Sequence, residues 1–112
     1  MRWTEFIMLR TAANSEQPVY KFLEQIAGSV AEPGLKEIAL YSHASIPGDF
    51  ALALLWDTEK PRAWGSDIAL ELVRELKRLG LVDHSVWTRI GEEKEIRNSD
   101  RVGKTLQRFA KE

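Results

Sequence analysis

The order in which apolar patterns follow one another constrains the fold of this chain more than any other feature. Some apolar runs have a period of about two residues, which is typical of strands, and others have a period of about 3.6, which is typical of helices. In chain order the runs lie at residues 4–11, 19–30, 37–45, 50–56, 68–79 and 84–90. The second and fifth runs are helical, so the predicted order is strand, helix, strand, strand, helix, strand.

Polar residues, proline and glycine indicate where these elements begin and end. Asn14 and Ser15 can each cap the first predicted helix, and Ser66 can cap the second. Gly80 follows the second helix and is expected to end it in the left-handed conformation. Residues 46–49, with the sequence Ile-Pro-Gly-Asp, have turn chemistry and predict a hairpin between the two middle strands.

This element order predicts a ferredoxin-like α+β domain, in which a four-stranded antiparallel sheet carries both helices on one face. Both faces of the predicted strands carry large apolar groups: Phe6 and Met8 alternate with Ile7 and Leu9. Because a solvated face would be more polar, we predict a dimeric α/β barrel in which a second copy packs its sheet against the bare face. If the strand face that carries Leu54 packs against the partner, an arginine at this position should separate the dimer.

Length and composition narrow the class of protein, its partners and its location. The chain has 112 residues, of which 44% are hydrophobic, and fits one domain. We assign residues 1–91 to it and residues 92–112 to a charged connector with a short, extra C-terminal helix. The formal charge of −1 gives no sustained positive field, so neither nucleic acid nor a membrane is an expected partner.

The inventory of residues also bears on location and redox chemistry. The chain contains no cysteine, which excludes disulfides, thiolate metal sites and cysteine nucleophiles. It begins without the pattern of a signal peptide, and no apolar run approaches the roughly 20 residues needed to span a bilayer. We therefore expect a cytoplasmic protein.

Three segments carry a family resemblance: the turn at residues 32–35 (Glu-Pro-Gly-Leu), the strand end at residues 53–57 (Ala-Leu-Leu-Trp-Asp), and the helix-to-strand passage at residues 79–87. On these segments the chain resembles the dimeric α+β barrel proteins, in particular the antibiotic biosynthesis monooxygenase-like family. The resemblance covers about residues 4–91. It implies a homodimer with a pocket between sheet and helices, used for cofactor-free oxygenation of aromatic polyketides, for haem degradation or for tasks that are unknown. Fold similarity does not select among these activities.

Alternate residues of a strand share one face, and this alternation indicates a set of candidate site residues. Tyr41 and His43 share one face of the second strand, and Trp87 and Arg89 share one face of the last. If they meet in a pocket, His43 is the candidate base, Arg89 holds an oxyanion, and the two aromatic rings stack on an acidic aromatic ligand. Alternatively, Tyr41 and Trp87 are core or interface aromatics, and the other two lie at strand ends.

Trp56 is a further candidate for substrate binding. Trp56 and Trp64 flank the loop around Pro61 and could close over a pocket, or they could anchor this loop by burial. His84 has the opposite parity to Trp87, so it should face the helices or the loop mouth if Trp87 faces the sheet interface. Its position beside an aspartate after a helix end favours a surface or capping residue over a catalyst.

The sequence predicts no cofactor. The only two histidines lie far apart, and neither pairs at i+2 or i+4 with another ligand type in a recognised metal motif. Haem-degrading relatives use a histidine on a helix, and residues 67–79 contain none. Cofactor-free oxygenases often use an asparagine on the first strand, and residues 3–11 contain none. No glycine-rich phosphate loop and no hydrolase triad can be assembled.

Two classes of function remain open at this point. The first is a homodimer that binds a small apolar or aromatic molecule, with cofactor-independent monooxygenation as its candidate activity. The second is a non-catalytic structural or interaction domain whose bare sheet face serves only to form the dimer. An enclosed cavity with His43 and Arg89 pointing inward would favour the first, and a filled sheet interface the second. Under the first, replacing His43 by alanine should abolish oxidation and leave the dimer intact.

Overall fold

A computed structural model describes residues 1–91, so the predicted connector and C-terminal helix at residues 92–112 lie outside the described residues. The described part has the predicted order of elements. These are β1 (Arg2–Arg10), a short 3-10 helix η1 (Ala13–Ser15), α1 (Glu16–Ser29), β2 (Leu35–Ser42), β3 (Asp49–Asp57), α2 (Asp67–Leu76) and β4 (Leu81–Thr88). None of the helices in this part of the chain is long and apolar enough to cross a membrane.

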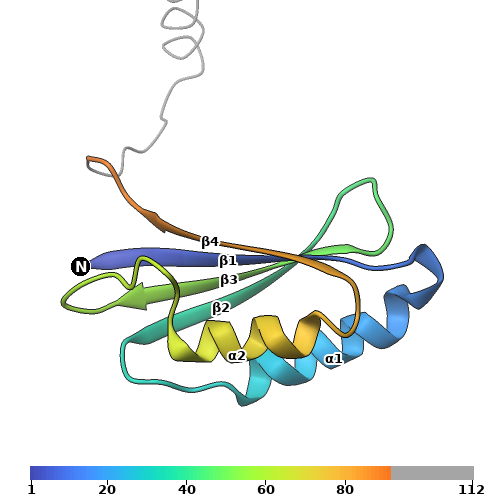
Figure 1. The fold of residues 1–112 in the computed structure, drawn as a ribbon, viewed down its shortest axis with the longest axis horizontal. Helices are drawn as coiled ribbons and strands as arrows, with labels where there is room; N and C mark the ends of the chain where they lie inside the picture. Colours follow the sequence, from blue (N-terminus) through green and yellow to red (C-terminus); the bar gives the residue numbers. More distant parts are fainter. Residues whose placement is uncertain (92–112) are drawn as a thin grey trace, which may run out of the picture.

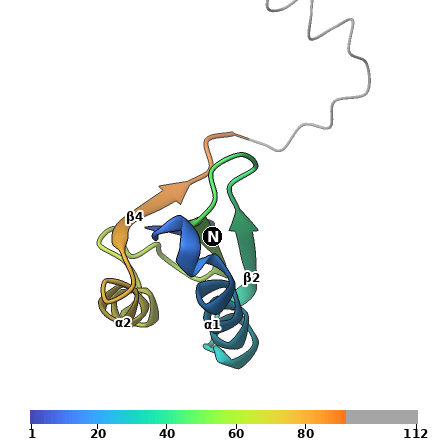
Figure 2. The ribbon, with the colours of Figure 1, turned by 90° about the vertical axis from the view of Figure 1, so that its right-hand side faces the viewer.

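The four strands form one antiparallel sheet in the order β2-β3-β1-β4. Figures 1 and 2 show both helices on the same side of this sheet, with α1 beneath β2 and α2 beneath β4. Among the described elements, none covers the opposite face, which we call the open face. The predicted ferredoxin-like α+β architecture is therefore confirmed.

The helices form where the sequence predicts, because each has one apolar stripe. In α1, Val19 and Leu23 are buried one helical turn apart. In α2, the buried residues are Ala69, Leu72 and Leu76. The caps differ in detail: the Ser66 hydroxyl accepts a hydrogen bond from the Ala69 backbone N–H, as predicted, whereas Ser15 occupies the cap position of α1 without a side-chain hydrogen bond.

The role predicted for Gly80 is wrong. The helix ends at Leu76, and Gly80 is not among the glycines with positive φ in the described residues. Its backbone instead lies directly against the carbonyl of Arg10, and a Cβ at this position would overlap that carbonyl oxygen. Glycine is needed here because the segment before β4 passes close to the end of β1, not because the chain adopts a left-handed conformation.

Strand register determines which parity faces the helices. Glu5 lies opposite Leu54, Ile7 opposite Leu52 and Leu9 opposite Phe50, and directly opposed residues share a face. All of these side chains are buried. Leu54 is fully buried between the sheet and the helices, so its side chain lies on the covered face and not on the open face. An arginine there would disrupt the core of the protomer, and the test proposed for the dimer at this position addresses the wrong face.

Candidate functional site

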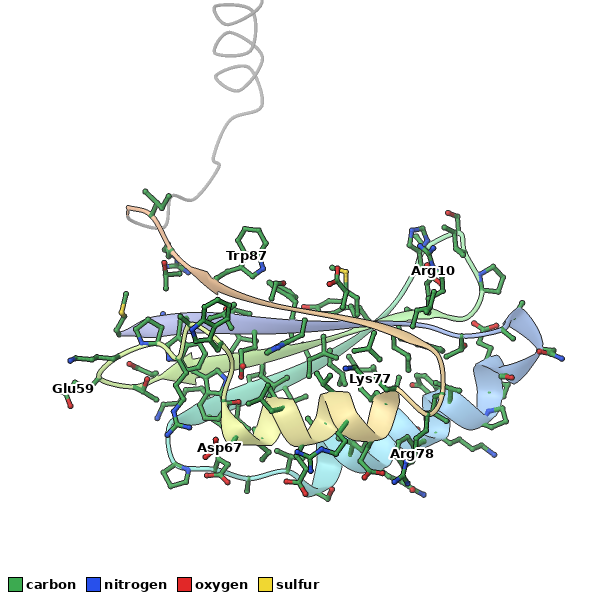
Figure 3. The ribbon with its side chains drawn as sticks, in the orientation of Figure 1. Arg10, Glu59, Asp67, Lys77, Arg78 and Trp87 are labelled. Carbon is green, nitrogen blue, oxygen red and sulfur yellow. The ribbon has the colours of Figure 1, made fainter. Side chains whose placement is uncertain are left out.

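The open face carries large apolar side chains that are exposed to solvent. Met8, Tyr41, Leu81 and Trp87 have exposed fractions of 52%, 55%, 74% and 61%. Trp87 and Arg10 project from this face, away from the helices and towards opposite ends of the sheet (Figure 3). An exposed apolar patch of this kind is typical of a surface that binds another molecule.

Two hollows lie at opposite ends of the open face. The first has a volume of about 420 Å³ and lies where β1 and β2 end and β4 begins. Its walls include Met8, Ala51 and Leu81, and its polar groups come from Tyr41 and His43. We call it the Tyr41 hollow. The ion pair between Arg10 Nε and Asp49 Oδ2, at 3.3 Å, also borders the Tyr41 hollow.

Hydrogen bonds within its own turn constrain His43. Nδ1 accepts the backbone N–H of Ser45 at 3.1 Å and that of Ile46 at 3.0 Å. A neutral imidazole that accepts at Nδ1 carries its proton on Nε2, an assignment that follows from the hydrogen-bond network. The donor of the neutral His43 ring, which borders the Tyr41 hollow, is then Nε2–H. A base would need a bare nitrogen towards the ligand, so these contacts do not support the role of base predicted for His43.

The second hollow has a volume of about 540 Å³ and is lined in part by Phe6, Leu55, Trp87 and Arg89. We call it the Trp87 hollow. The indole N–H of Trp87 donates to the Ser85 hydroxyl at 2.7 Å, which holds the ring over the open face.

Asp57 also borders the Trp87 hollow. Its Oδ1 accepts a hydrogen bond from the N-terminal ammonium of Met1 at 3.0 Å. This hydrogen bond, together with the positive charge of the ammonium, lowers the pKa of Asp57 below its ordinary value. Asp57 therefore keeps a negative charge at the edge of this hollow well below neutral pH.

The predicted site residues share a face but not one hollow within a single chain. Trp87 lies opposite Thr4, whereas His43 hydrogen-bonds to Asp49, which lies opposite Arg10. At about 3.4 Å per residue, positions 4 and 10 of β1 are about 20 Å apart. Within one protomer, the four side chains therefore do not meet in a single pocket. Parity fixes the face, but the register places the two pairs at opposite ends.

Trp56 lies on the other face of the sheet, among the core residues. Its ring stacks on Trp3 with centroids 5.4 Å apart and planes 12° apart, and only 6% of Trp56 is exposed. Trp56 also borders a third hollow of about 320 Å³, next to the start of α2. Burial agrees with the anchoring alternative for Trp56. For Trp64 that alternative is wrong, because this residue is 90% exposed.

A buried polar cluster, which we call the Glu5 cluster, lies on the helix side of the sheet. The Glu5 carboxylate is fully buried and is contacted by Trp56, Ser66 and His84. Oε2 accepts from Trp56 Nε1 at 2.8 Å and from Ser66 Oγ at 2.6 Å. Oε1 accepts from the Ser66 backbone N–H at 2.7 Å and lies 3.1 Å from His84 Nε2. Since Ser66 caps α2, the cluster ties this helix to three strands.

The position of His84 corrects one prediction and agrees with another. His84 faces the helices, as its parity relative to Trp87 predicted, but it is neither a surface residue nor a helix cap. Its side chain is 15% exposed and pairs with Glu5. The sequence did contain a signal for the Glu5 cluster: a glutamate stands between Trp3 and Ile7 at a core position of β1, one of the two inner strands. A buried carboxylate requires partners, so this pattern indicates a polar site inside the core.

Within residues 1–91, no group of three or more histidine, aspartate or glutamate side chains gathers as it would around a metal ion. The described residues therefore suggest no donor set for a metal.

Comparisons with known proteins concern the fold. No model of a known protein family matches the chain, and no curated protein matches it. Among solved structures, Rv0793 from Mycobacterium tuberculosis is 16% identical and superposes with a TM-score of 0.62 over 84% of this chain and 100% of its own. A candidate antibiotic biosynthesis monooxygenase from Deinococcus radiodurans is 19% identical, with a TM-score of 0.59 over 88% of this chain and 100% of its own.

A third solved structure is that of SnoaB from Streptomyces nogalater, a cofactor-independent oxygenase. It is 14% identical, with a TM-score of 0.50 over 84% of this chain and 96% of its own. At these identities the likeness concerns the fold alone. The chain therefore has the fold of the antibiotic biosynthesis monooxygenase-like proteins, and the resemblance predicted from the three segments is confirmed at that level.

Proposed function

We propose that the chain works as a homodimer, joined through the open face of its sheet, and binds a small apolar or aromatic organic molecule in the Tyr41 hollow. The observation that supports this proposal is the open face itself. It combines exposed Met8, Tyr41, Leu81 and Trp87 with a hollow among them. A second copy on this face would remove the apolar side chains from water and close the hollow.

The arrangement of the two sheets determines what such a site contains. If they pack with strands nearly at right angles about a two-fold axis, the end of one sheet that carries Trp87 and Arg89 covers the end of the other that carries Tyr41 and His43. The residues that one protomer keeps apart would then form two equivalent sites, each shared between protomers. Tyr41 and the partner's Trp87 would stack on a planar ring, and His43 Nε2–H and the partner's Arg89 would bind its oxygen.

Cofactor-independent monooxygenation is the candidate activity for such a site. Its support is the fold shared with SnoaB and with the candidate monooxygenase from Deinococcus radiodurans, and a fold by itself does not transfer an activity. Without a cofactor the substrate supplies both electrons, so an activated CH2 group and O2 give a carbonyl and water. His43 and Arg89 would stabilise the negative charge that develops on the substrate oxygen.

A non-catalytic interaction domain is the second candidate. One observation favours it: Nδ1 of His43 is already used to hold its own turn, which gives this residue a structural role without any ligand. In that case Met8, Tyr41 and Trp87 fill the interface between the two sheets, and no enclosed hollow remains.

Oligomeric state and bound mass test the two candidates together. Native mass spectrometry of protein purified under gentle conditions should give a dimer that carries one organic molecule per chain. Replacing Trp87 by arginine should give monomers, because the charge would be buried without a partner. Trp64→Arg is the matched control, because Trp64 is 90% exposed and lies in the loop between β3 and α2.

Four other outcomes are informative. A wild-type monomer, or a Trp87→Arg variant that remains dimeric, contradicts the proposed interface. A dimer without a bound molecule favours the interaction domain. If a ligand is present, His43→Ala should release it and abolish any oxidation while the dimer persists, and retained turnover would remove His43 from the mechanism.

A further inference from the structure

The pairing of His84 with Glu5 has a consequence for proton transfer, because the other partners of the carboxylate fix the direction of the hydrogen bonds. The Trp56 indole N–H and the Ser66 backbone N–H can only donate. The Ser66 hydroxyl accepts from the Ala69 N–H at 3.1 Å, so its own proton is directed towards Glu5 Oε2 at 2.6 Å. Glu5 is thus surrounded by donors, as an ionised carboxylate requires.

The same reasoning assigns the proton on the imidazole. Nε2 of His84 lies 3.1 Å from Glu5 Oε1, an oxygen that already accepts the Ser66 N–H, so Nε2 carries a proton and donates it. In the neutral ring, Nδ1 then has a free lone pair. A carboxylate that holds one ring nitrogen and leaves the other bare is the arrangement that orients a histidine as a general base.

Nδ1 of His84 is also accessible. Within residues 1–91, no buried side-chain nitrogen or oxygen lacks a hydrogen-bond partner, and the Glu5 contact is the only hydrogen bond of the His84 side chain there. Because Nδ1 has no partner in that part of the chain, it must reach solvent. The exposed fraction of the side chain, 15%, agrees with a ring whose one edge is buried and whose other edge is open.

The loop before α2 is shaped to accommodate this ring. Gly65 has a φ of 106°, a conformation that favours glycine, and a Cβ on it would overlap the His84 imidazole. The Gly65 backbone therefore packs directly against the ring. Glu5 fixes one edge and Gly65 one side, so the orientation of the imidazole is set before any ligand arrives.

We propose that Glu5 and His84 form a general-base dyad that removes a proton from a weakly acidic C–H or O–H group of a small organic molecule. The proton passes to His84 Nδ1, and the bonding pair stays on the molecule as a carbanion, enolate or phenolate. The imidazolium that forms is stabilised by the buried Glu5 carboxylate. This site lies on the helix side of the sheet and does not depend on the dimer or on the Tyr41 hollow.

A neutral carbon acid, 5-nitrobenzisoxazole, provides a probe that needs no knowledge of the natural ligand. A base removes its ring C–H proton, the N–O bond breaks, and a coloured cyano-nitrophenolate forms. We expect wild-type protein to promote this reaction, and His84→Gln to lower kcat/KM by at least about a hundredfold, the low end of what a positioned base contributes. Glu5→Gln should lower kcat and leave KM unchanged, since Glu5 acts through His84.

The controls separate proton transfer from folding. Glu71→Gln makes the same chemical change on the exposed face of α2 and should leave the rate unchanged. Nitrogen-15 NMR of the wild-type protein, recorded at a high pH where the imidazole is neutral, should place the His84 proton on Nε2, a readout that remains if the Glu5 variant fails to fold. A proton on Nδ1, or a folded His84→Gln variant as fast as the wild type, would overturn the proposal. Neither result would bear on the dimer, which is tested by Trp87→Arg.

Discussion

Replacing Glu5 by glutamine tests the energetic role of the Glu5 cluster, because it preserves shape and changes only the hydrogen-bond inventory. In one orientation the amide NH2 takes the place of Oε2 and faces the Trp56 indole N–H, whose donor atom lies 2.8 Å away. In the other it takes the place of Oε1 and faces the Ser66 backbone N–H at 2.7 Å. Neither group can accept a hydrogen bond, so each orientation leaves one buried donor unpaired.

The loss of stability expected for Glu5→Gln follows from that single unpaired donor. A buried donor without an acceptor costs about 1–3 kcal/mol, and the contact between two donors adds to this cost. The weaker hydrogen bonds of a neutral amide are partly offset by the removal of a buried charge. We therefore expect Glu5→Gln to lower the free energy of unfolding by about 2–3 kcal/mol. For a domain of this size, that corresponds to a fall in Tm of roughly 10–20 °C.

Urea unfolding followed by far-UV circular dichroism measures this loss, and two further variants make the measurement specific. Glu71→Gln, on the exposed face of α2, should change stability by less than about 0.5 kcal/mol. In a Trp56→Phe background the amide can turn its NH2 towards the position that the indole N–H has left. The cost of Glu5→Gln should then fall by at least about 1 kcal/mol. An unchanged stability of Glu5→Gln, or an equal cost in both backgrounds, would refute the reasoning.

Three further predictions concern single residues. Gly80→Ala should destabilise the protein by more than about 1 kcal/mol in thermal unfolding, because the added Cβ would overlap the carbonyl of Arg10. The lowered pKa of Asp57 means that its pair with the Met1 ammonium stabilises the folded state above the ordinary aspartate pKa and is lost as pH falls through the lowered value. Asp57→Asn should therefore lower stability at neutral pH and make no difference once Asp57 is protonated, as urea unfolding at both pH values would show. Trp64→Ala should leave the stability within about 0.5 kcal/mol, because the ring is 90% exposed, and a larger change would reveal a contact of this loop.

The fold could be predicted from the sequence because its signals are local and agree with one another. Periods of two and 3.6 give the order of elements, and Ser66 marks the start of α2 by a hydrogen bond that the structure contains. It was harder to predict which of the two alternating sets of side chains on each strand faces the helices. Phe6 and Met8 are as apolar as Ile7 and Leu9, and Glu5 makes the core parity of β1 look like the polar one. Its burial depends on donors from three other elements, which no local pattern reveals.

The candidate site was predicted only in part, for a related reason. Alternation along a strand correctly placed Trp87 and His84 on opposite faces, because each strand is a local object. Position along the sheet depends on register, which is set by pairing between strands that are distant in sequence. His43 and Arg89 therefore share a face with no contact between their two hollows, and only the pairing of β1 with β3 and β4 shows how far apart they lie.

Side chains alternate along β1, one of the two inner strands of the sheet, so this strand contributes to two separate surfaces. Its odd residues pack under the helices and include Glu5, whose carboxylate must be satisfied inside the core. Its even residues, such as Met8, form the open face, where an apolar side chain costs little in a dimer and more in a monomer. A substitution at an odd or an even position of β1 therefore perturbs one surface directly and affects the other surface only through the backbone. The proposed proton transfer at His84 and the proposed association through the open face can for this reason be tested separately, even though their residues alternate along the same strands.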